Sequence, residues 1–251
     1  MRDFSQVCEI LRNNGVELWV DLGALLGFQR EGHLLEWEED IDVGTLSTFE
    51  DIKNIEPKLE QFGWKCFKKY KGMSIQNNKR TTKIDIKFYR EEGNSVCANF
   101  VVYKMKFLLP ICDLILWVMH LYPPEYKYET RLSIDVLRRF NKIARICIPG
   151  FLRHCISKLT ELFYYNIVLK GYKISFPRDY ILPLKVMKIG SYPYKIPASP
   201  ESFLSLIYGK NWKKPMKIIP GTDRYPDGSS RFLTKRVEEQ RPDLIEVERF
   251  V

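Results

Sequence analysis

The sequence has no apolar run long enough to span a bilayer. A membrane-spanning helix needs about 20 consecutive apolar residues, whereas the most apolar stretch, residues 107–122, contains Pro110, Asp113 and His120. We expect this stretch to form a helix that is buried or lies along a membrane surface. The first residues, Met1 to Ser5, lack the apolar segment of a secretory signal. We therefore expect the protein to be cytoplasmic, either free in the cytoplasm or at the inner face of the membrane.

The six cysteines lack the spacing of a metal site or a disulfide framework. No two of them form a CxxC pair, which a zinc ribbon needs, and scattered cysteines are typical of a reducing compartment. Internal repeats and low-complexity segments are also absent. What is left is a chain of 251 residues, 45% of them hydrophobic, which is enough for a sizeable core.

Acidic residues are outnumbered by basic ones. The 40 Lys and Arg residues exceed the 31 Asp and Glu residues by nine, which favours anionic partners such as nucleotides, nucleic acid or a membrane surface. Part of this charge is interleaved with apolar residues in a helical pattern after residue 107, at Arg131, Arg138, Arg139, Lys142, Arg145, Arg153 and Lys158. The pattern predicts amphipathic helices. Their basic face is either solvated or binds an anionic membrane or polymer.

Apolar periodicity predicts alternating helices and strands before residue 105. The first expected helix ends near residue 12, and two more cover 24–28 and 48–62. The expected strands cover 16–20, 41–44 and 83–89, and a hairpin is expected over 64–76. Eight prolines beyond residue 177 predict loops and short elements. We therefore expect an α/β fold with a small mixed sheet, flanked by helices, that carries the catalytic carboxylates at one edge. The expected parts are a catalytic core (1–105), a basic helical region (106–176) and a C-terminal segment that packs back on the core (177–251).

Four carboxylates lie within the five residues Glu38-Glu39-Asp40-Ile41-Asp42. Side chains alternate along an extended segment, so Glu38, Asp40 and Asp42 point the same way. Their mutual repulsion is costly without a counterion, and oxygen ligands suit Mg²⁺ or Mn²⁺. A solvated acidic loop is the alternative interpretation.

Two further features agree with a phosphate-handling site. Gly23 follows a strand and opens a helix, where backbone N–H groups can approach a phosphate closely. Asp85 adds a carboxylate from a later strand, on the same face as Lys83 and Lys87. The two lysines either bind phosphate or form cross-strand salt bridges. This order of elements is similar to that of the nucleotidyltransferase superfamily.

Three stretches of the sequence resemble the LicD family of phosphocholine transferases, which includes fukutin and fukutin-related protein. The stretches are Leu18-Trp19-Val20-Asp21-Leu22-Gly23-Ala24-Leu25-Leu26-Gly27 with Arg30 and Trp37-Glu38-Glu39-Asp40-Ile41-Asp42-Val43-Gly44, then Ile84-Asp85-Ile86, and finally Ile181-Leu182-Pro183-Leu184 with Pro197 to Leu204, Tyr208-Gly209, Trp212 and Pro215. The resemblance covers residues 18–44, 84–86 and 181–215, and leaves the helical middle unmatched.

The resemblance implies transfer of a phospho-alcohol, such as phosphocholine, phosphoglycerol or phosphoribitol. The donor would be a CDP-activated alcohol, the acceptor a hydroxyl of a glycan or lipid-linked glycan, and the leaving group CMP, with no nucleic acid involved. In this interpretation Asp40, Asp42 and Asp85 are catalytic, with Asp85 taking the proton of the attacking hydroxyl. Two alternatives remain: a nucleotidyltransferase that releases pyrophosphate, and a degenerate member that binds nucleotide or glycan without turnover.

The implied ligands follow from the same match. Mg²⁺ or Mn²⁺ would be held by Glu38, Asp40, Asp42 and Asp85, and the donor phosphates would be contacted by Gly23, Ala24, Arg30, Lys83 and Lys87. Arg30 either clamps a phosphate or pairs with Glu36 or Glu38. The sequence departs from the family pattern at Leu22, where glycine is frequent, and at Ala24, where a hydroxyl residue is usual. Glutamate in place of aspartate lengthens the side chain of Glu38, so Asp40 and Asp42 are the better ligand candidates.

Overall fold

The structure, a computed structural model, divides the chain into two compact units. Unit 1 comprises Met1–Phe100 and Lys173–Glu246, and unit 2 comprises Val101–Tyr172 and Val247–Val251. The structure describes residues 1–36, 38, 40–69, 72–77, 82–105, 108, 111, 112, 115, 119, 134–163, 167, 169–220 and 222–248. Most of the helix predicted over 107–122 lies outside these residues.

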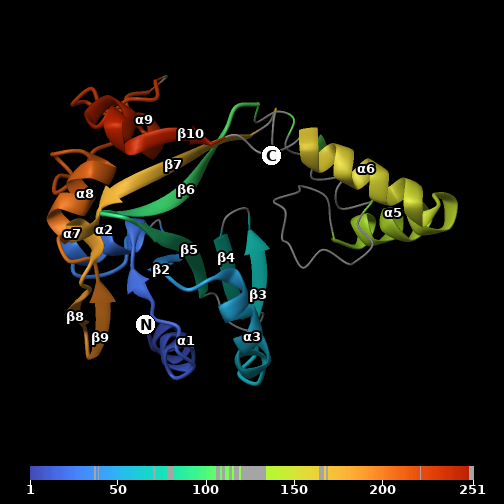
Figure 1. Ribbon diagram of the computed structural model, residues 1–251, viewed down its shortest axis with the longest axis horizontal. Helices are drawn as coiled ribbons and strands as arrows, with labels where there is room; N and C mark the ends of the chain where they lie inside the picture. The colour runs from blue at the N-terminus through green and yellow to red at the C-terminus, as the bar shows by residue number, and fades with distance from the viewer. Residues whose placement is uncertain are drawn as a thin grey trace. The chain divides into compact units, whose positions relative to one another are not determined.

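The strands form one mixed sheet. They are β1 (Trp19–Val20), β2 (Ile41–Thr45), β3 (Trp64–Lys69), β4 (Gly72–Asn77), β5 (Lys83–Glu92), β6 (Ser95–Tyr103), β7 (Leu169–Pro177), β8 (Lys185–Ile189), β9 (Tyr192–Ile196) and β10 (Ile245–Glu248). The main path through the sheet is β10-β7-β6-β5-β2-β1-β9-β8, and the β3–β4 hairpin joins it through β5 (Figure 1). Strand β2 runs parallel to β5 and antiparallel to β1, so the sheet is mixed, as expected.

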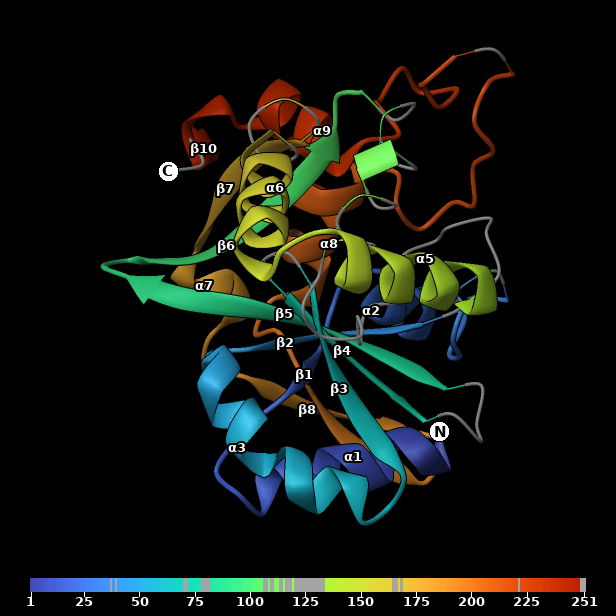
Figure 2. The same cartoon turned by 90° about the vertical axis from the view of Figure 1, so that its right-hand side faces the viewer.

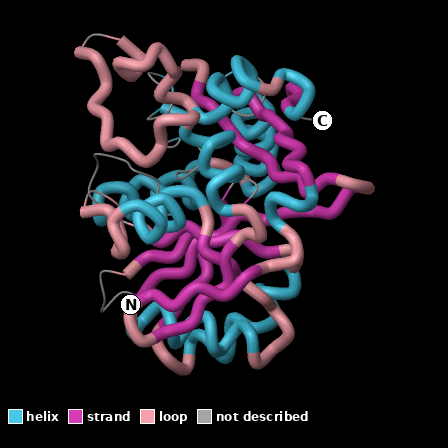
Figure 3. Tube along the Cα trace, turned by 90° about the vertical axis from the view of Figure 1, so that its left-hand side faces the viewer, coloured by secondary structure: helices cyan, strands magenta, loops and turns pink. Residues whose placement is uncertain are grey.

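Helices flank the strands of unit 1 on two sides. They are α1 (Arg2–Arg12), α2 (Leu22–Arg30), α3 (Phe49–Glu60), α7 (Arg178–Ile181), α8 (Pro200–Tyr208) and α9 (Leu233–Gln240), with the short 3-10 helix η3 (Pro242–Leu244). Helices α1 and α3 lie on one side of the strands, and α2 and α8 lie on the other (Figures 2 and 3). Unit 2 contains the helices α5 (Ile134–Cys147) and α6 (Gly150–Phe163). The α/β class expected from the sequence is confirmed.

Local sequence explains where the first helices begin and what they bury. Helix α1 buries Phe4, Val7 and Leu11, which recur at helical spacing. Helix α3 starts with a capping box, in which Thr48 Oγ1 accepts a hydrogen bond from the Asp51 backbone N–H and the Asp51 carboxylate accepts one from the Thr48 backbone N–H. Both helices therefore follow from short-range patterns.

The sheet departs from the sequence expectation in its extent. Of the strand predicted over 16–20, only Trp19–Val20 pairs with neighbouring strands. Strands β6 and β7 and the β8–β9 hairpin were not predicted, although residues 185–196 lie in the proline-containing segment. The carboxylates were expected at an edge, but β2 lies between β5 and β1 in the interior of the sheet. The reason is that β1 and β5 pair with β2 on its two sides, and local periodicity does not reveal which strands become neighbours. Strands from residues 169–196 then extend the sheet beyond β5 and β1.

A close approach of Trp19 to Gly44 marks the centre of the core. The indole of Trp19 packs over Gly44 of β2 so tightly that an added Cβ would lie 2.3 Å from Trp19 Cε2. The Trp19 ring also packs against Tyr89, with 5.1 Å between the ring centroids, and the Tyr89 ring packs against Phe176, with 6.1 Å between the centroids. Only glycine leaves room for this ring beside β2.

We predict that Gly44→Ala destabilises the protein by about 1–3 kcal/mol, because a methyl group at this position forces the Trp19 ring or the strand to move. Gly150→Ala serves as a control, since its Cβ would be 3.8 Å from the nearest atom, in Arg153. Chemical denaturation measures both. In a Trp19→Leu background the cost of Gly44→Ala should shrink; an unchanged cost there would contradict the proposed clash.

Candidate functional site

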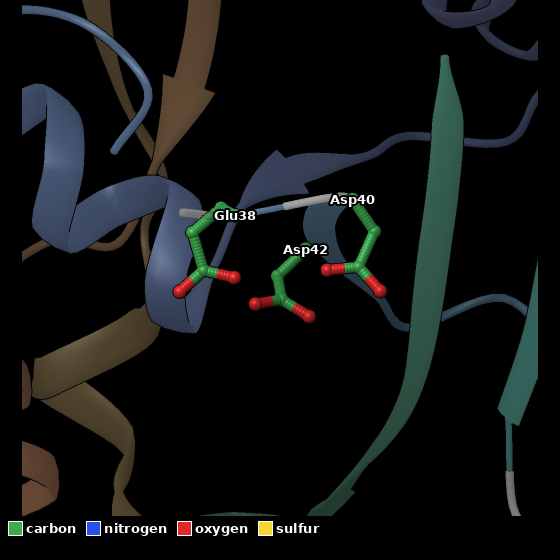
Figure 4. Close-up of side chains that lie close together, drawn as sticks. All are labelled: Glu38, Asp40 and Asp42. Atoms are coloured by element: carbon green, nitrogen blue, oxygen red, sulfur yellow. The ribbon is translucent and has the colours of Figure 1, made fainter. Parts of the chain in front are cut away.

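Three carboxylates converge at the amino-terminal end of β2. Glu38 and Asp40 precede the strand, Asp42 is its second residue, and one oxygen of each lies within 4.8 Å of the others. Figure 4 shows the three side chains pointing in the same direction, with Asp42 between Glu38 and Asp40. The alternation that predicted their convergence is therefore confirmed, and Glu38, the weaker ligand candidate, is part of the cluster.

The start of α2 lies directly against this cluster. The backbone N–H of Gly23 donates a hydrogen bond to Asp42 Oδ2 at 3.1 Å. A Cβ at Gly23 would lie 2.7 Å from Glu38 Oε1 and 3.1 Å from Asp42 Oδ2, so a side chain here would displace the carboxylates. Gly23 was expected to open the helix; it lies in the first turn, one residue after the helix begins at Leu22, and Ala24 follows it, fully buried.

Asp85 and Lys83 extend the site onto β5. The parallel pairing of β2 and β5 places Asp85 opposite Asp42. Lys83 Nζ lies 2.8 Å from Asp40 Oδ2 and 3.5 Å from Asp85 Oδ2, so the salt-bridge alternative holds for this lysine. Lys87 Nζ lies 4.0 Å from the centroid of the Phe100 ring. Asp85 and Lys83 thus lie next to the cluster. Among the described residues, the carboxylates that converge within 4.8 Å of one another are Glu38, Asp40 and Asp42, without Asp85.

Arg30 lies at the other end of α2. Its Nε is 2.7 Å from Glu31 Oε1, and its side chain is largely buried. Glu31 was not among the partners considered from the sequence, which were Glu36 and Glu38. The ion pair joins the last residue of the helix to the residue that follows it.

Asp21 is a buried carboxylate that the sequence analysis did not single out. Its Oδ1 accepts the backbone N–H of Leu22 at 2.9 Å, and its Oδ2 accepts the Tyr89 hydroxyl at 2.6 Å. Burial raises the pKa of Asp21 to about 6, against the lowering effect of these hydrogen bonds. Leu22 adopts a φ of 38°, a region that glycine, frequent here in the family, enters without strain. An aspartate just before a helix is a typical N-cap, and that signal could have identified Asp21.

Burial and neighbouring negative charges both shift the carboxylates of the site. Burial, followed by the charges of Asp21, Asp40, Glu38 and Asp85 in that order, raises the pKa of Asp42 to about 8. Burial also raises the pKa of Glu38 and of Asp40. A cation beside these oxygens would favour their ionised forms. The donor set, all carboxylate oxygen, fits a hard divalent ion, so this cluster can hold a metal ion.

Helices α8 and α9 bring a tyrosine and an arginine toward the same cluster. Burial raises the pKa of Tyr208, the charges of Asp42 and Glu38 raise it further, and the charge of Arg236 lowers it. Arg236 is 4% exposed; its Nε donates to the Ile207 carbonyl at 2.7 Å and its guanidinium carbon lies 5.3 Å from the Tyr208 ring centroid. Among the described residues it forms no ion pair with a carboxylate. No local pattern distinguishes Arg236 from the other basic residues of the chain.

We predict that metal-free protein loses stability as pH rises from 6 to 8. The pKa of Asp42 is about 8 in the folded state and 3.8 ordinarily, so over this range the unfolded chain has released the proton that the folded chain keeps. The free energy of unfolding therefore falls with pH, by up to about 1.4 kcal/mol per pH unit. Asp42→Asn should flatten this slope, whereas Asp51→Asn, which changes an exposed carboxylate of α3, should not. Thermal melts at several pH values, with a chelator present, measure this pH dependence. Equal slopes of stability against pH in Asp42→Asn and the unaltered protein would contradict the raised pKa of Asp42.

Comparison with known proteins finds a family model that is similar to the region containing this site. Residues 15–115 match the family model described as LicD/FKTN/FKRP, nucleotidyltransferase domain. The uncharacterized protein RP689 of Rickettsia prowazekii (strain Madrid E) is 26% identical over 100 residues, a match that spans 39% of this chain and 36% of that protein. A crystal structure of ANT(2″)-Ia in complex with adenylyl-2″-tobramycin and a solution structure of ANT(2″)-Ia are 11% identical, cover 64% of this chain and 96% and 90% of their own, and have TM-scores of 0.29. Residues 15–115 of this chain are thus similar to the nucleotidyltransferase domain of the LicD/FKTN/FKRP family.

Proposed function

We propose that the protein is a metal-dependent phosphotransferase that moves a phospho-alcohol from a CDP-activated donor to a hydroxyl of a glycan or lipid-linked glycan, with release of CMP. The observation that supports it most is the convergence of Glu38, Asp40 and Asp42 beside the Gly23 backbone N–H. Oxygen ligands next to a helix start suit a substrate that carries phosphates and arrives with a divalent ion. The family match over residues 15–115 agrees with this chemistry.

In this proposal the start of α2 receives the donor diphosphate. The first N–H groups of a helix have no partner inside the helix and point toward an anion placed there. Mg²⁺ or Mn²⁺ held by Glu38, Asp40 and Asp42 would stabilise negative charge on the phosphate oxygens and on the departing CMP. Gly23 keeps the backbone close to both groups, because a Cβ would occupy the space that the carboxylates fill. Positioning and charge stabilisation then supply most of the rate.

Asp85 is the proposed general base. The acceptor hydroxyl oxygen forms a bond to the phosphorus of the phospho-alcohol, the bond from that phosphorus to the CMP oxygen breaks, and the hydroxyl proton passes to Asp85. Asp85 lies opposite Asp42 across the β2–β5 pairing, next to the three converging carboxylates. Lys83, between Asp40 and Asp85, holds the two carboxylates at fixed positions.

The buried guanidinium of Arg236 is a second source of positive charge in this proposal. A buried cation without a carboxylate partner is costly, and an anionic ligand offsets that cost. Arg236 packs on Tyr208, whose ionisation responds to Asp42 and Glu38. We therefore assign Arg236 to the phosphates of the bound donor.

The function is tested by incubating the protein with CDP-choline, CDP-glycerol and CDP-ribitol, with Mg²⁺ or Mn²⁺ and a glycan acceptor, and measuring CMP. We expect CMP from at least one donor, and loss of its release in Asp40→Ala and Asp42→Ala, which remain folded because removal of one carboxylate relieves repulsion. Lys213→Ala, which changes an exposed ion pair with Glu201, is the control. Pyrophosphate release from a nucleoside triphosphate would indicate nucleotidyl transfer instead, and full activity of both aspartate variants would refute the metal assignment.

Asp85→Asn distinguishes a base from a third metal ligand. For a base, we expect turnover to fall about 10²–10⁴-fold while the affinities for Mn²⁺ and for the CDP-alcohol stay unchanged. Titration of Mn²⁺ and of the donor into Asp85→Asn protein measures these affinities separately from turnover. A many-fold weaker Mn²⁺ affinity would show that Asp85 ligates the ion.

A further inference from the structure

Helices α5 and α6 of unit 2 expose large apolar side chains and bury small or polar ones. The side chains of eight large apolar residues are between 39% and 79% exposed: Phe140, Ile143, Ile146, Phe151, Leu152, Leu159, Leu162 and Phe163. On the same helices Asn141, Ala144, Arg153 and Ser157 are buried. A helix of a water-soluble protein normally shows the opposite arrangement. We call the eight exposed side chains the apolar faces of α5 and α6.

The apolar faces are each continuous along their helix. On α5 the exposed large apolar residues recur every three positions, at 140, 143 and 146. On α6 helical periodicity places those at 151, 152, 159, 162 and 163 on one side of the helix. Exposed apolar side chains scattered singly need no explanation, whereas a continuous row indicates a binding surface. The rows therefore require an apolar partner.

Positive charge accompanies these faces. Residues 134–163 contain six basic residues, Arg138, Arg139, Lys142, Arg145, Arg153 and Lys158, and two acidic ones, Asp135 and Glu161. Arg139, Lys142, Arg145 and Lys158 are exposed, and helical spacing places Arg139 and Lys158 next to the apolar rows. Apolar side chains flanked by cations match a bilayer interface with anionic headgroups, where each cation adds about 1 kcal/mol of attraction.

The lengths of the helices exclude a spanning arrangement for these two elements. Each has 14 residues, or about 21 Å at 1.5 Å per residue, against a hydrocarbon core of about 30 Å. Across the part of the chain that the structure describes, no helix combines the length and hydropathy needed to cross a bilayer.

We propose that the apolar faces of α5 and α6 bind the surface of an anionic bilayer, with the helices lying in the interface. Large apolar side chains enter the boundary between headgroups and acyl chains, and the flanking lysines and arginines contact anionic headgroups. The inference stands apart from the proposed chemistry, since none of these residues belongs to the carboxylate site.

The full-length protein should co-sediment with vesicles of phosphatidylcholine and phosphatidylglycerol, and much less with phosphatidylcholine alone. Rising salt should weaken the binding, because the electrostatic attraction is screened over about 10 Å at 0.1 M. The double variant Ile146→Gln, Phe151→Gln should bind at least about tenfold more weakly, since two apolar side chains no longer enter the interface. The thermal transition should stay unchanged, because these side chains are 76% and 79% exposed.

The matched control is Phe62→Gln, Val186→Gln, which removes two apolar side chains of unit 1 that are 50% and 60% exposed. It should bind vesicles like the unaltered protein. Equal binding of the Ile146→Gln, Phe151→Gln protein and the control would overturn the proposal, as would absence of sedimentation with anionic vesicles at low salt. A dimer in solution that only the first variant dissociates, without vesicle binding, would assign the faces to a second copy of the chain and also overturn it.

Discussion

Repulsion among carboxylates packed at the start of β2 is the constraint on which the rest of unit 1 depends. Asp21 is fully buried and Asp42 is partly buried, and burial raises the pKa of both. The protein offsets part of the cost with local hydrogen bonds, from the Leu22 N–H and the Tyr89 hydroxyl to Asp21 and from the Gly23 N–H to Asp42. What remains favours a cation, because opposite charge is the most direct relief for converging carboxylates.

Such a cluster needs a rigid frame, and the sheet supplies it. Strand β2 has a hydrogen-bonded neighbour on each side, and the Asp21 N–H donates to the Asp42 carbonyl at 3.0 Å just beyond the paired residues. Trp19 closes the space above Gly44, and the rings of Tyr89, Phe176 and Phe203 continue the packing. Residues 173–246 thereby join residues 1–100 in one core, in which the buried Arg236 of α9 packs on Tyr208 of α8.

The two units present opposite solutions to the burial of polar groups. Unit 1 places charged groups inside and gives most of them hydrogen bonds, which is typical of a site prepared for an ionic substrate. Helices α5 and α6 of unit 2 keep polar side chains inside and leave apolar ones outside. Each arrangement is costly in water alone, and a partner of matching chemistry would lower that cost. The partners that we propose are phosphate and a divalent ion in the first case and a lipid surface in the second.

The sequence by itself determined the elements that depend on neighbours along the chain. Alternation aligned Glu38, Asp40 and Asp42, a glycine after a short strand marked the start of α2, and the strand pattern placed Asp85 on its polar face, because side-chain direction follows the local period. The roles assigned to these residues stay predictions. Only the tertiary structure decided that Asp21 accepts a hydrogen bond from Tyr89, 68 residues away, that Arg236 is buried beside Tyr208, and that β2 lies inside the sheet. Strand partners and burial depend on contacts between segments distant in sequence, and no local periodicity encodes which segments meet.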